Sequence, residues 1–148
     1  MHVAIGSDHA GVTLKAALVE LLRELAIPHH DFGTFTTQTA DYPDVARAVA
    51  SAVAGGEYDR GIISCGTGIG ASIAANKVRG IRAALCHDTF SARMSREHND
   101  ANVLCMGGRI IGPGLAVEIA REWLATPFSG EERHARRIGK IARIEGEP

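Results

Sequence analysis

Short runs of consecutive apolar residues alternate along this chain with longer stretches in which apolar residues recur every three or four positions. The first run, HVAIG at residues 2–6, ends at a glycine, and the stretch behind it places leucines at helical spacing: Leu14, Leu18, Leu21, Leu22 and Leu25. A short run without alternation is typical of a strand buried on both faces, whereas the leucine spacing is typical of an amphipathic helix. The start of the chain therefore predicts a strand, a loop and a helix.

The same order of strand, loop and helix repeats over most of the chain. Further strands are predicted near residues 29–31 and at the runs RGIIS, IRAAL and NVLCMGG, which begin at residues 60, 81 and 102. Helices are predicted between and after them: one carries Val45, Val49, Ala52 and Val53 on one face, one runs through ASIAANK, a polar one covers about residues 90–99, and one follows Pro113. Because strands that alternate with helices pair in parallel through crossovers, we expect one α/β domain over residues 1–148. It is a doubly wound, Rossmann-like parallel sheet of about five strands with flanking helices.

A last amphipathic stretch, ERHARRIGKIARI, lies outside this repeating unit. It predicts an extra C-terminal helix over about residues 131–144, with Ile138, Ile141 and Ala142 to bury. The repeating unit leaves no obvious place for these side chains. We therefore expect the helix to dock on a second copy of the chain.

Charge and cysteine usage narrow the class of protein. Sixteen Lys and Arg against 17 Asp and Glu give a formal net charge of −1, so no general attraction to nucleic acid or to an anionic membrane is expected, and a bound anion needs a local site. The three cysteines, Cys65, Cys86 and Cys105, fit neither a disulfide framework nor the paired spacing of a zinc site. No signal-peptide pattern opens the chain, and no apolar run approaches about 18 residues. These features predict a cytoplasmic protein with reduced thiols and no metal.

The unusual chemistry of the sequence lies in loops that follow predicted strands. These are GSDHAG after the first strand, CGTGIG after the third, CHDT after the fourth and GGR after the fifth. In doubly wound sheets the ligand binds beyond the carboxyl ends of the strands, where the direction of winding reverses. We expect the four loops to meet there and to form the binding site.

The loop with Gly66, Gly68 and Gly70 leads into a helix expected to start near Ala71. Its backbone amides can turn inward and meet negative charge, which predicts an oxyanion cradle. A dinucleotide site is the alternative, since Asp88 follows at the end of the next strand. The GxGxG spacing, the position on the third strand and the fewer than 80 residues that follow the loop argue against it.

Cys65 directly precedes this loop, so its thiol is the only one of the three beside a predicted anion site. Amides and nearby cations favour the thiolate, which can act as a nucleophile or as a base. A nucleophile would need a histidine partner, and His9, His87 and His98 are available. Both roles remain open at this point, whereas Cys86 and Cys105 are interpreted as small buried hydrophobic residues.

Five motifs together resemble the type B ribose-5-phosphate isomerases: GSDHAG, DYPD, CGTGIGASIAANKVRGIRAA, SREHNDANVLCMGGR and ERHARR. The resemblance runs from Ala4 to about Arg137, and the wider family includes galactose-6-phosphate isomerase subunits. It implies an enzyme that interconverts ribose 5-phosphate and ribulose 5-phosphate through an enediolate, without metal or organic cofactor. By resemblance Cys65 is the base, and Thr67 with the loop steadies the enediolate through Gly66, Gly68, Ile69 and Gly70. Relatives that lack the cysteine use a glutamate at the place of Ala71.

The resemblance also implies how the sugar phosphate is held. His98 matches the residue that opens the sugar ring, and Asp8, His9 and Asn99 match residues that contact the sugar. Asp8 could equally be a turn or cap residue, and Tyr42, a candidate for closing over the sugar, could instead pack beside Pro43. Arg133 and Arg137 match the arginines that bind the phosphate, and Arg109 matches a further binding position.

The same family pattern implies a homodimer or a dimer of dimers in which the site is completed across the interface. No nucleic acid or membrane partner is expected. Two alternatives stay open: an isomerase of another aldose phosphate, such as allose or galactose 6-phosphate, and a non-catalytic sugar-phosphate sensor. A sensor would keep the glycine loop and the arginines but would have no need of Cys65 or His98. A nucleotide-binding module is a third, weaker alternative.

Overall fold

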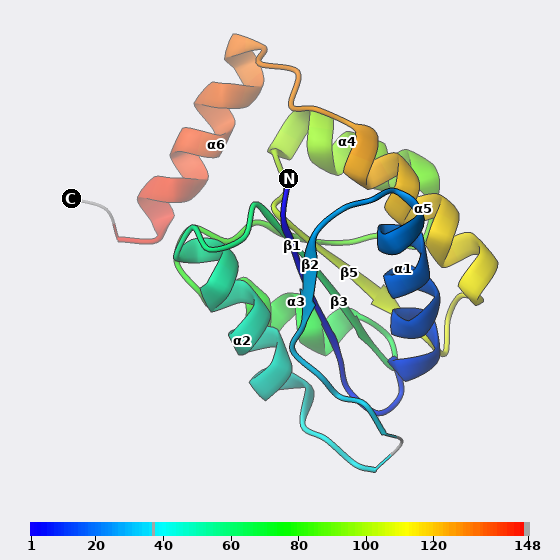
Figure 1. The fold of residues 1–148 in the computed structure, drawn as a ribbon. Coiled ribbons are helices and arrows are strands. Elements are labelled where there is room, and N and C mark those ends of the chain that lie inside the picture. Colours follow the sequence, from blue (N-terminus) through cyan, green and yellow to red (C-terminus); the bar gives the residue numbers. More distant parts are fainter. Residues whose placement is uncertain (37, 147–148) are drawn as a thin grey trace.

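The computed structural model describes residues 1–36 and 38–146, and within this part of the chain five parallel strands form one sheet. The sheet has the order β2-β1-β3-β5-β4 (Figure 1). The strands are β1 (Val3–Ser7), β2 (His29–Asp31), β3 (Arg60–Cys65), β4 (Ala83–Leu85) and β5 (Val103–Gly107). The predicted α/β fold with a parallel sheet of about five strands is confirmed.

Helices cover both faces of this sheet, as expected for a doubly wound fold. One face is covered by α1 (Val12–Glu24), α4 (Thr89–Asn99) and α5 (Pro113–Ala125), and the other by α2 (Tyr42–Ala54) and α3 (Ile69–Ala75). The sixth helix, α6 (Glu132–Ile144), stands apart from both layers and contacts α4 (Figure 1). It is the extra C-terminal helix that the sequence predicts.

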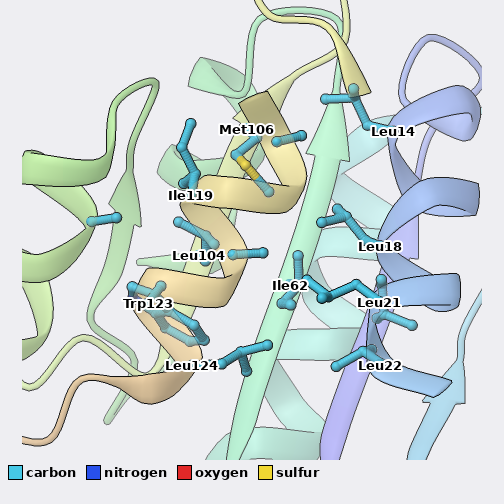
Figure 2. Packing of buried hydrophobic residues seen from close by; sticks show 14 of the residues in the cluster. Leu14, Leu18, Leu21, Leu22, Ile62, Leu104, Met106, Ile119, Trp123 and Leu124 are labelled. Atoms are coloured by element: carbon cyan, nitrogen blue, oxygen red, sulfur yellow. The ribbon is translucent and has the colours of Figure 1, made fainter. Parts of the chain in front are cut away.

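The apolar runs form strands because successive side chains enter two different cores. In β1, Val3 and Ile5 belong to the core beneath α1 and α5, whereas Ala4 belongs to the core beneath α2 and α3. Figure 2 shows the first core, where Leu18 and Trp123, both fully buried, pack over the sheet from α1 and α5. Each residue of β1 and β5 is therefore removed from water whichever way it points, which explains the lack of alternation.

The edge strands and one helix start differ from the expectation. Strand β2 is the polar sequence HHD and is partly exposed, because an edge strand has only one neighbour to pack against. Strand β4 begins at Ala83 and not at Ile81, since the amide of Ala83 already bonds to the side chain of Asn76. Helix α3 begins at Ile69, two residues before Ala71.

All strands point the same way, so the loops after them gather at one edge of the sheet. In Figure 1 this edge lies at the bottom, whereas α6 lies at the upper left. Helix α4 runs back from the carboxyl end of β4 to the amino end of β5. Its 11 residues span about 15 Å at 1.5 Å per residue, so its last turn lies at the edge opposite to the loops.

None of the helices in residues 1–36 and 38–146 combines the length and the apolar character that crossing a membrane requires.

Candidate active site

A cleft with a volume of about 200 Å³ opens at the carboxyl ends of β1 and β3. It is lined by Asp8, His9, Ala10, Tyr42, Cys65, Gly66, Thr67, Gly70 and Arg109. The sheet winds outward in one direction from β1 to β2 and in the other from β3 to β5 and β4, so the cleft lies where the winding reverses. Three of the four predicted loops meet here. The fourth, CHDT, does not line the cleft, because β4 is the far edge strand.

Cys65, the last residue of β3, is one of the residues that line this cleft. The side chain is 3% exposed, and its Sγ accepts a hydrogen bond from the amide of Gly68 at 3.1 Å. The amide of Gly68 is thus directed at the cysteine and not at open space.

The other two thiols lie outside the cleft. Burial raises the pKa of Cys86 to about 11, and burial also raises the pKa of Cys105. Both stay protonated and unreactive at neutral pH. This agrees with their interpretation as small buried hydrophobic residues.

Gly68 makes the tight approach of the loop to the sheet feasible. Its φ of +77° is left-handed, and a Cβ built there would lie 2.5 Å from Cδ1 of Leu85 and 2.8 Å from the carbonyl carbon of Met106. A side chain would therefore clash with the sheet as well as strain the backbone. The absence of a side chain lets the Gly68 amide reach the sulfur.

Two other loop residues take roles that the sequence does not indicate. The amide of Ile69 donates to Oγ1 of Thr67 at 3.3 Å, and the Ile69 side chain is 51% exposed and does not line the cleft. Gly70 packs under the ring of Tyr42, since a Cβ on Gly70 would lie 2.5 Å from Cζ of that ring. Tyr42 thereby closes one side of the cleft.

Asp8 and His9 are held by the backbone around them. The carboxylate of Asp8 accepts hydrogen bonds from the amides of Ala10 and Gly11 at 2.9 and 3.1 Å, so Asp8 is both a turn residue and part of the cleft. Nδ1 of His9 accepts a hydrogen bond from the amide of Ala40 at 3.2 Å. The neutral ring therefore carries its proton on Nε2.

Arg109 supplies positive charge to the cleft. Its amide donates to the carbonyl oxygen of Gly66 at 2.9 Å, and its guanidinium group lies over that glycine, 3.4 Å from the place of a Cβ. An anionic group that entered the cleft would meet this side chain. A cation at this position fits a phosphorylated or carboxylated ligand.

The remaining predicted site residues do not join this cleft within one chain. His98 and Asn99 are the last two residues of α4, and Arg133 and Arg137 lie on α6. The end of α4 lies near the amino ends of the strands and α6 contacts α4, whereas Cys65 lies at the carboxyl end of β3. Arg133 is exposed and donates from Nε to the carboxylate of Glu131 at 2.7 Å.

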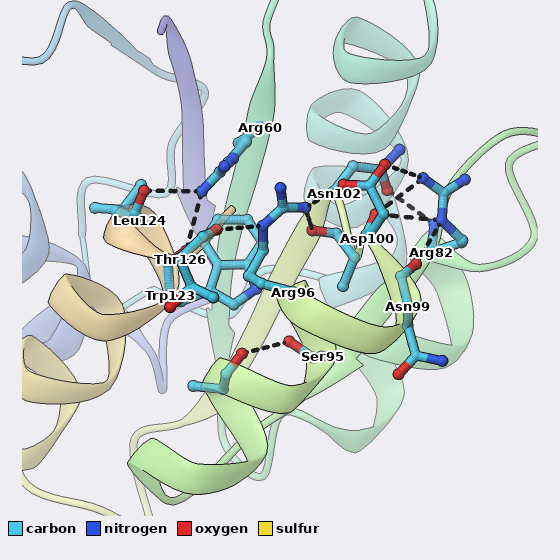
Figure 3. Close-up of polar contacts among 12 residues, drawn as sticks. Arg60, Arg82, Ser95, Arg96, Asn99, Asp100, Asn102, Trp123, Leu124 and Thr126 are labelled. Carbon is cyan, nitrogen blue, oxygen red and sulfur yellow. Dashed lines mark hydrogen bonds and ion pairs between the residues drawn. The ribbon is translucent and has the colours of Figure 1, made fainter. Parts of the chain in front are cut away.

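Two arginines hold the end of α4 in place, as Figure 3 shows. Arg82 donates to the carbonyl oxygens of Asn99 and Asp100 at 2.9 and 2.8 Å. Arg96 is 6% exposed and donates to the carboxylate of Asp100 at 2.8 Å. Asp100 has a φ of 45° and ends the helix in the left-handed region. These bonds position the turn that carries His98.

His98 also has an aromatic neighbour on α6. The ring of His134, from α6, stacks on the ring of His98 with centroids 4.2 Å apart and planes at 13°. His134 is 4% exposed. No local signal in the sequence indicates this contact or the bonds from Arg82, since these partners are far apart along the chain, whereas Arg96 and Asp100 are only four residues apart.

The chain is similar to one group of proteins over nearly all of its length. A family model described as Ribose/Galactose Isomerase matches residues 3–141. YwlF of Bacillus subtilis, which carries the provisional name of a sugar phosphate isomerase, is 58% identical over 98% of this chain and 97% of its own. Ribose-5-phosphate isomerase B of Escherichia coli is 48% identical over 97% of this chain and 95% of its own. The solved structure of Clostridium thermocellum ribose-5-phosphate isomerase B is 53% identical, with a TM-score of 0.96 over 99% of this chain and 98% of that one.

Proposed function

Because the chain belongs to the ribose/galactose isomerase family, we propose that it interconverts ribose 5-phosphate and ribulose 5-phosphate, with Cys65 as the base. The resemblance and the expectation of an isomerase are confirmed by the family match over residues 3–141. The substrate and the roles of single residues are the proposal. The observation that carries it is that Cys65 lines the cleft and that its Sγ accepts a hydrogen bond from the amide of Gly68.

The proposed reaction moves one proton between two carbons. The thiolate of Cys65 takes the proton from carbon 2 of the open-chain aldose, and the electron pair of that C–H bond forms the double bond between carbons 1 and 2. The carbonyl oxygen on carbon 1 becomes the oxyanion of an enediolate. The thiol then returns the proton to carbon 1, while the hydroxyl proton on oxygen 2 passes to oxygen 1, which leaves the ketose.

The cleft offers donors for the charge that develops on these oxygens. The hydroxyl of Thr67 and Nε2–H of His9 belong to residues that line the cleft, and Arg109 adds a full positive charge. Fixed donors of this kind stabilise a developing oxyanion by several kcal/mol. In this proposal Cys65 acts as the base, and Thr67, His9 and Arg109 stabilise the negative charge on the enediolate.

Ring opening and phosphate binding need the residues at the other edge of the sheet. Free ribose 5-phosphate is mostly a closed ring, and His98 is suited to protonate the ring oxygen because an imidazole titrates near neutral pH. His98 cannot reach the cleft of its own chain across the sheet. We therefore propose a dimer in which His98, Asn99, Arg133 and Arg137 of the partner subunit complete each cleft.

The choice of sugar is tested by turnover with a panel of aldose phosphates. We expect the purified protein to convert ribose 5-phosphate with the highest kcat/KM, ahead of allose 6-phosphate and galactose 6-phosphate. A higher kcat/KM for either hexose phosphate would favour the alternative substrate. Binding without turnover of any of the three would favour the sensor.

The role of Cys65 is tested with the same assay on Cys65→Ala. We expect kcat to fall at least ~100-fold with substrate binding retained, because a general base acts on the transition state more than on the bound substrate. Cys86→Ala is the matched control, since that thiol lies outside the cleft, and its kcat should stay within about 2-fold. Retained turnover in Cys65→Ala would mean that another group is the base.

A further inference from the structure

The contact between α4 and α6 centres on two stacked imidazoles. His134 is 4% exposed, and its ring lies 4.2 Å from the ring of His98 at an angle of 13°. The aromatic overlap brings a buried side chain of the extra helix directly onto the residue proposed for ring opening. His98 itself is only partly buried, so one of its ring faces is covered and the rest is accessible.

Hydrogen bonding at Nε2 does not explain why His134 occupies this place. In the described part of the chain its Nε2 is buried and has no hydrogen-bond partner. A buried polar atom without a hydrogen-bond partner destabilises the fold, so this atom does not account for the presence of a histidine ring at position 134. The interaction that remains is the stack itself.

The charges around the pair keep the proton off His134. Burial lowers its pKa from 6.5, and the positive charges of His98, Arg133 and Arg137 lower it further, against a smaller opposite effect of Glu131. Two stacked imidazoles that were both protonated would repel each other. Burial and these charges therefore favour a neutral His134 against the ring of His98.

The backbone on either side of His98 is fixed, whereas its ring has two torsions of its own. Arg82 and Arg96 hold the turn after it, and the carbonyl oxygen of Glu97 accepts the amide of Ser129 at 3.1 Å. These bonds do not reach the imidazole. The ring plane is set by the neighbour that lies flat against it.

We propose that His134 is a positioning residue that holds the His98 imidazole in the orientation needed to open the sugar ring. This inference rests on the proposed function and deepens it. Proton transfer to a ring oxygen depends steeply on direction and distance, so a freely rotating imidazole loses much of its effect. Arg133 and Arg137 flank His134 on the same helix, so the segment proposed to bind the phosphate also orients the ring-opening group.

A double-mutant cycle tests whether His134 acts through His98. We expect His134→Leu, which fills the space without a flat ring, to lower kcat with ribose 5-phosphate about 10-fold. In a His98→Asn background the same change should lower kcat less than about 2-fold, because the group that it orients is gone. His134→Phe should keep kcat within about 3-fold of the wild type, since it retains the stack and loses no bond at Nε2.

The other outcomes separate the inference from the proposed function. If His134→Leu lowers kcat by the same factor with and without His98, the role of His134 is structural only and the inference is overturned. A kcat of His134→Phe no higher than that of His134→Leu would also overturn it. Unchanged kcat in His134→Leu would overturn it too. If the wild type does not convert ribose 5-phosphate at all, the proposed function fails first. Thermal unfolding of each variant confirms that the compared proteins are folded.

Discussion

The sulfur of Cys65 and the amide of Gly68 are three residues apart and form one local unit. The left-handed φ of Gly68 turns the chain just after the strand, and the turn aims an N–H group back at the strand's last side chain. Chemistry at this scale depends on a missing Cβ as much as on the thiol. The residue-scale prediction therefore concerns the glycine.

Replacing Gly68 by alanine should destabilise the fold more than the backbone strain alone would. Gly80 is the matched control, because its φ of +82° is also left-handed but nothing lies within 4 Å of its Cβ. We expect Gly80→Ala to cost about 1–2 kcal/mol of unfolding free energy and Gly68→Ala about 1–3 kcal/mol more. Urea unfolding measures both, and equal losses would mean that Leu85 and Met106 give way without cost.

At the scale of elements, the proposed chemistry is divided between the ends of different helices and strands. The carboxyl end of β3 carries the base, the carboxyl end of α4 carries His98, and α6 carries the phosphate-binding arginines. Helix α6 contacts α4, so its arginines lie on the side of α4 and not at the cleft of the same chain.

Arg137→Ala should weaken substrate binding more than it slows the reaction. A guanidinium group that binds phosphate acts on the bound substrate and the transition state alike, so we expect KM to rise roughly 10-fold with a smaller change in kcat. Arg136→Ala is the control, because the neighbouring residue faces another side of α6. An unchanged KM for Arg137→Ala would remove Arg137 from the phosphate site.

For the whole molecule, the proposal that His98 and Cys65 act in one site implies a second chain, because the two residues lie at opposite ends of the strands. Mixing Cys65→Ala with His98→Asn variants, refolded together, tests this directly. Each mixed dimer has one site with an intact Cys65 and an intact His98, and one site with both changes. With random pairing, we expect about a quarter of the wild-type activity.

The mixture also has an outcome that would reject the shared site. Activity no greater than the mean of the two separate variants would show that Cys65 and His98 do not act in one site across two chains. Light scattering gives the oligomeric state on the same samples. An active monomer at micromolar concentration would contradict the dimer as well.

Global stability should fall as the pH drops below about 6.5. Burial lowers the pKa of His87 in the folded state, with Asp88 opposing, and the pKa of His134 is lowered too. The unfolded chain then takes up protons first as the pH falls through 6.5, so unfolding is favoured below this value and no further stability is gained above it. Nε2 of His87 also accepts the amide of Gly107 at 3.0 Å, a bond that a protonated ring cannot make.

Urea unfolding at pH 7.5 and 5.5 measures this dependence. We expect a lower unfolding free energy at pH 5.5, and a smaller difference in His87→Gln. His30→Gln is the control, since His30 is exposed and its ring lies edge-on to Phe32. An unfolding free energy that is unchanged or higher at pH 5.5 would show that neither His87 nor His134 governs the pH dependence of stability.

Much of the fold could be predicted because it depends on local periodicity. The apolar runs became strands, and helices such as α4 ended where predicted, at Asn99. The motif with Cys65 was informative because its key contact spans three residues. The edge strand β2 was less informative, since HHD has no apolar pattern.

The contacts around His98 could not be predicted in the same way. Arg82 and His134 come from outside α4, and their partners depend on how α4 packs against its neighbours, whereas Arg96 bonds to Asp100 only four residues along the chain. Sequence reasoning placed the loop after β4 in the cleft. The strand order makes β4 the outermost strand of the sheet, separated from β3 by β5, so this loop does not line the cleft.

The sequence by itself determined the family, the elements and the chemical types available at each strand end, because spacing and motif are properties of neighbours along the chain. Only the tertiary structure decided which groups share a cleft. Parallel pairing collects Asp8, Cys65 and Arg109 at one edge, and α4 carries His98 back to the other. That separation follows from the direction of a helix between two parallel strands, and it is the physical reason why the proposed enzyme needs a second copy of itself.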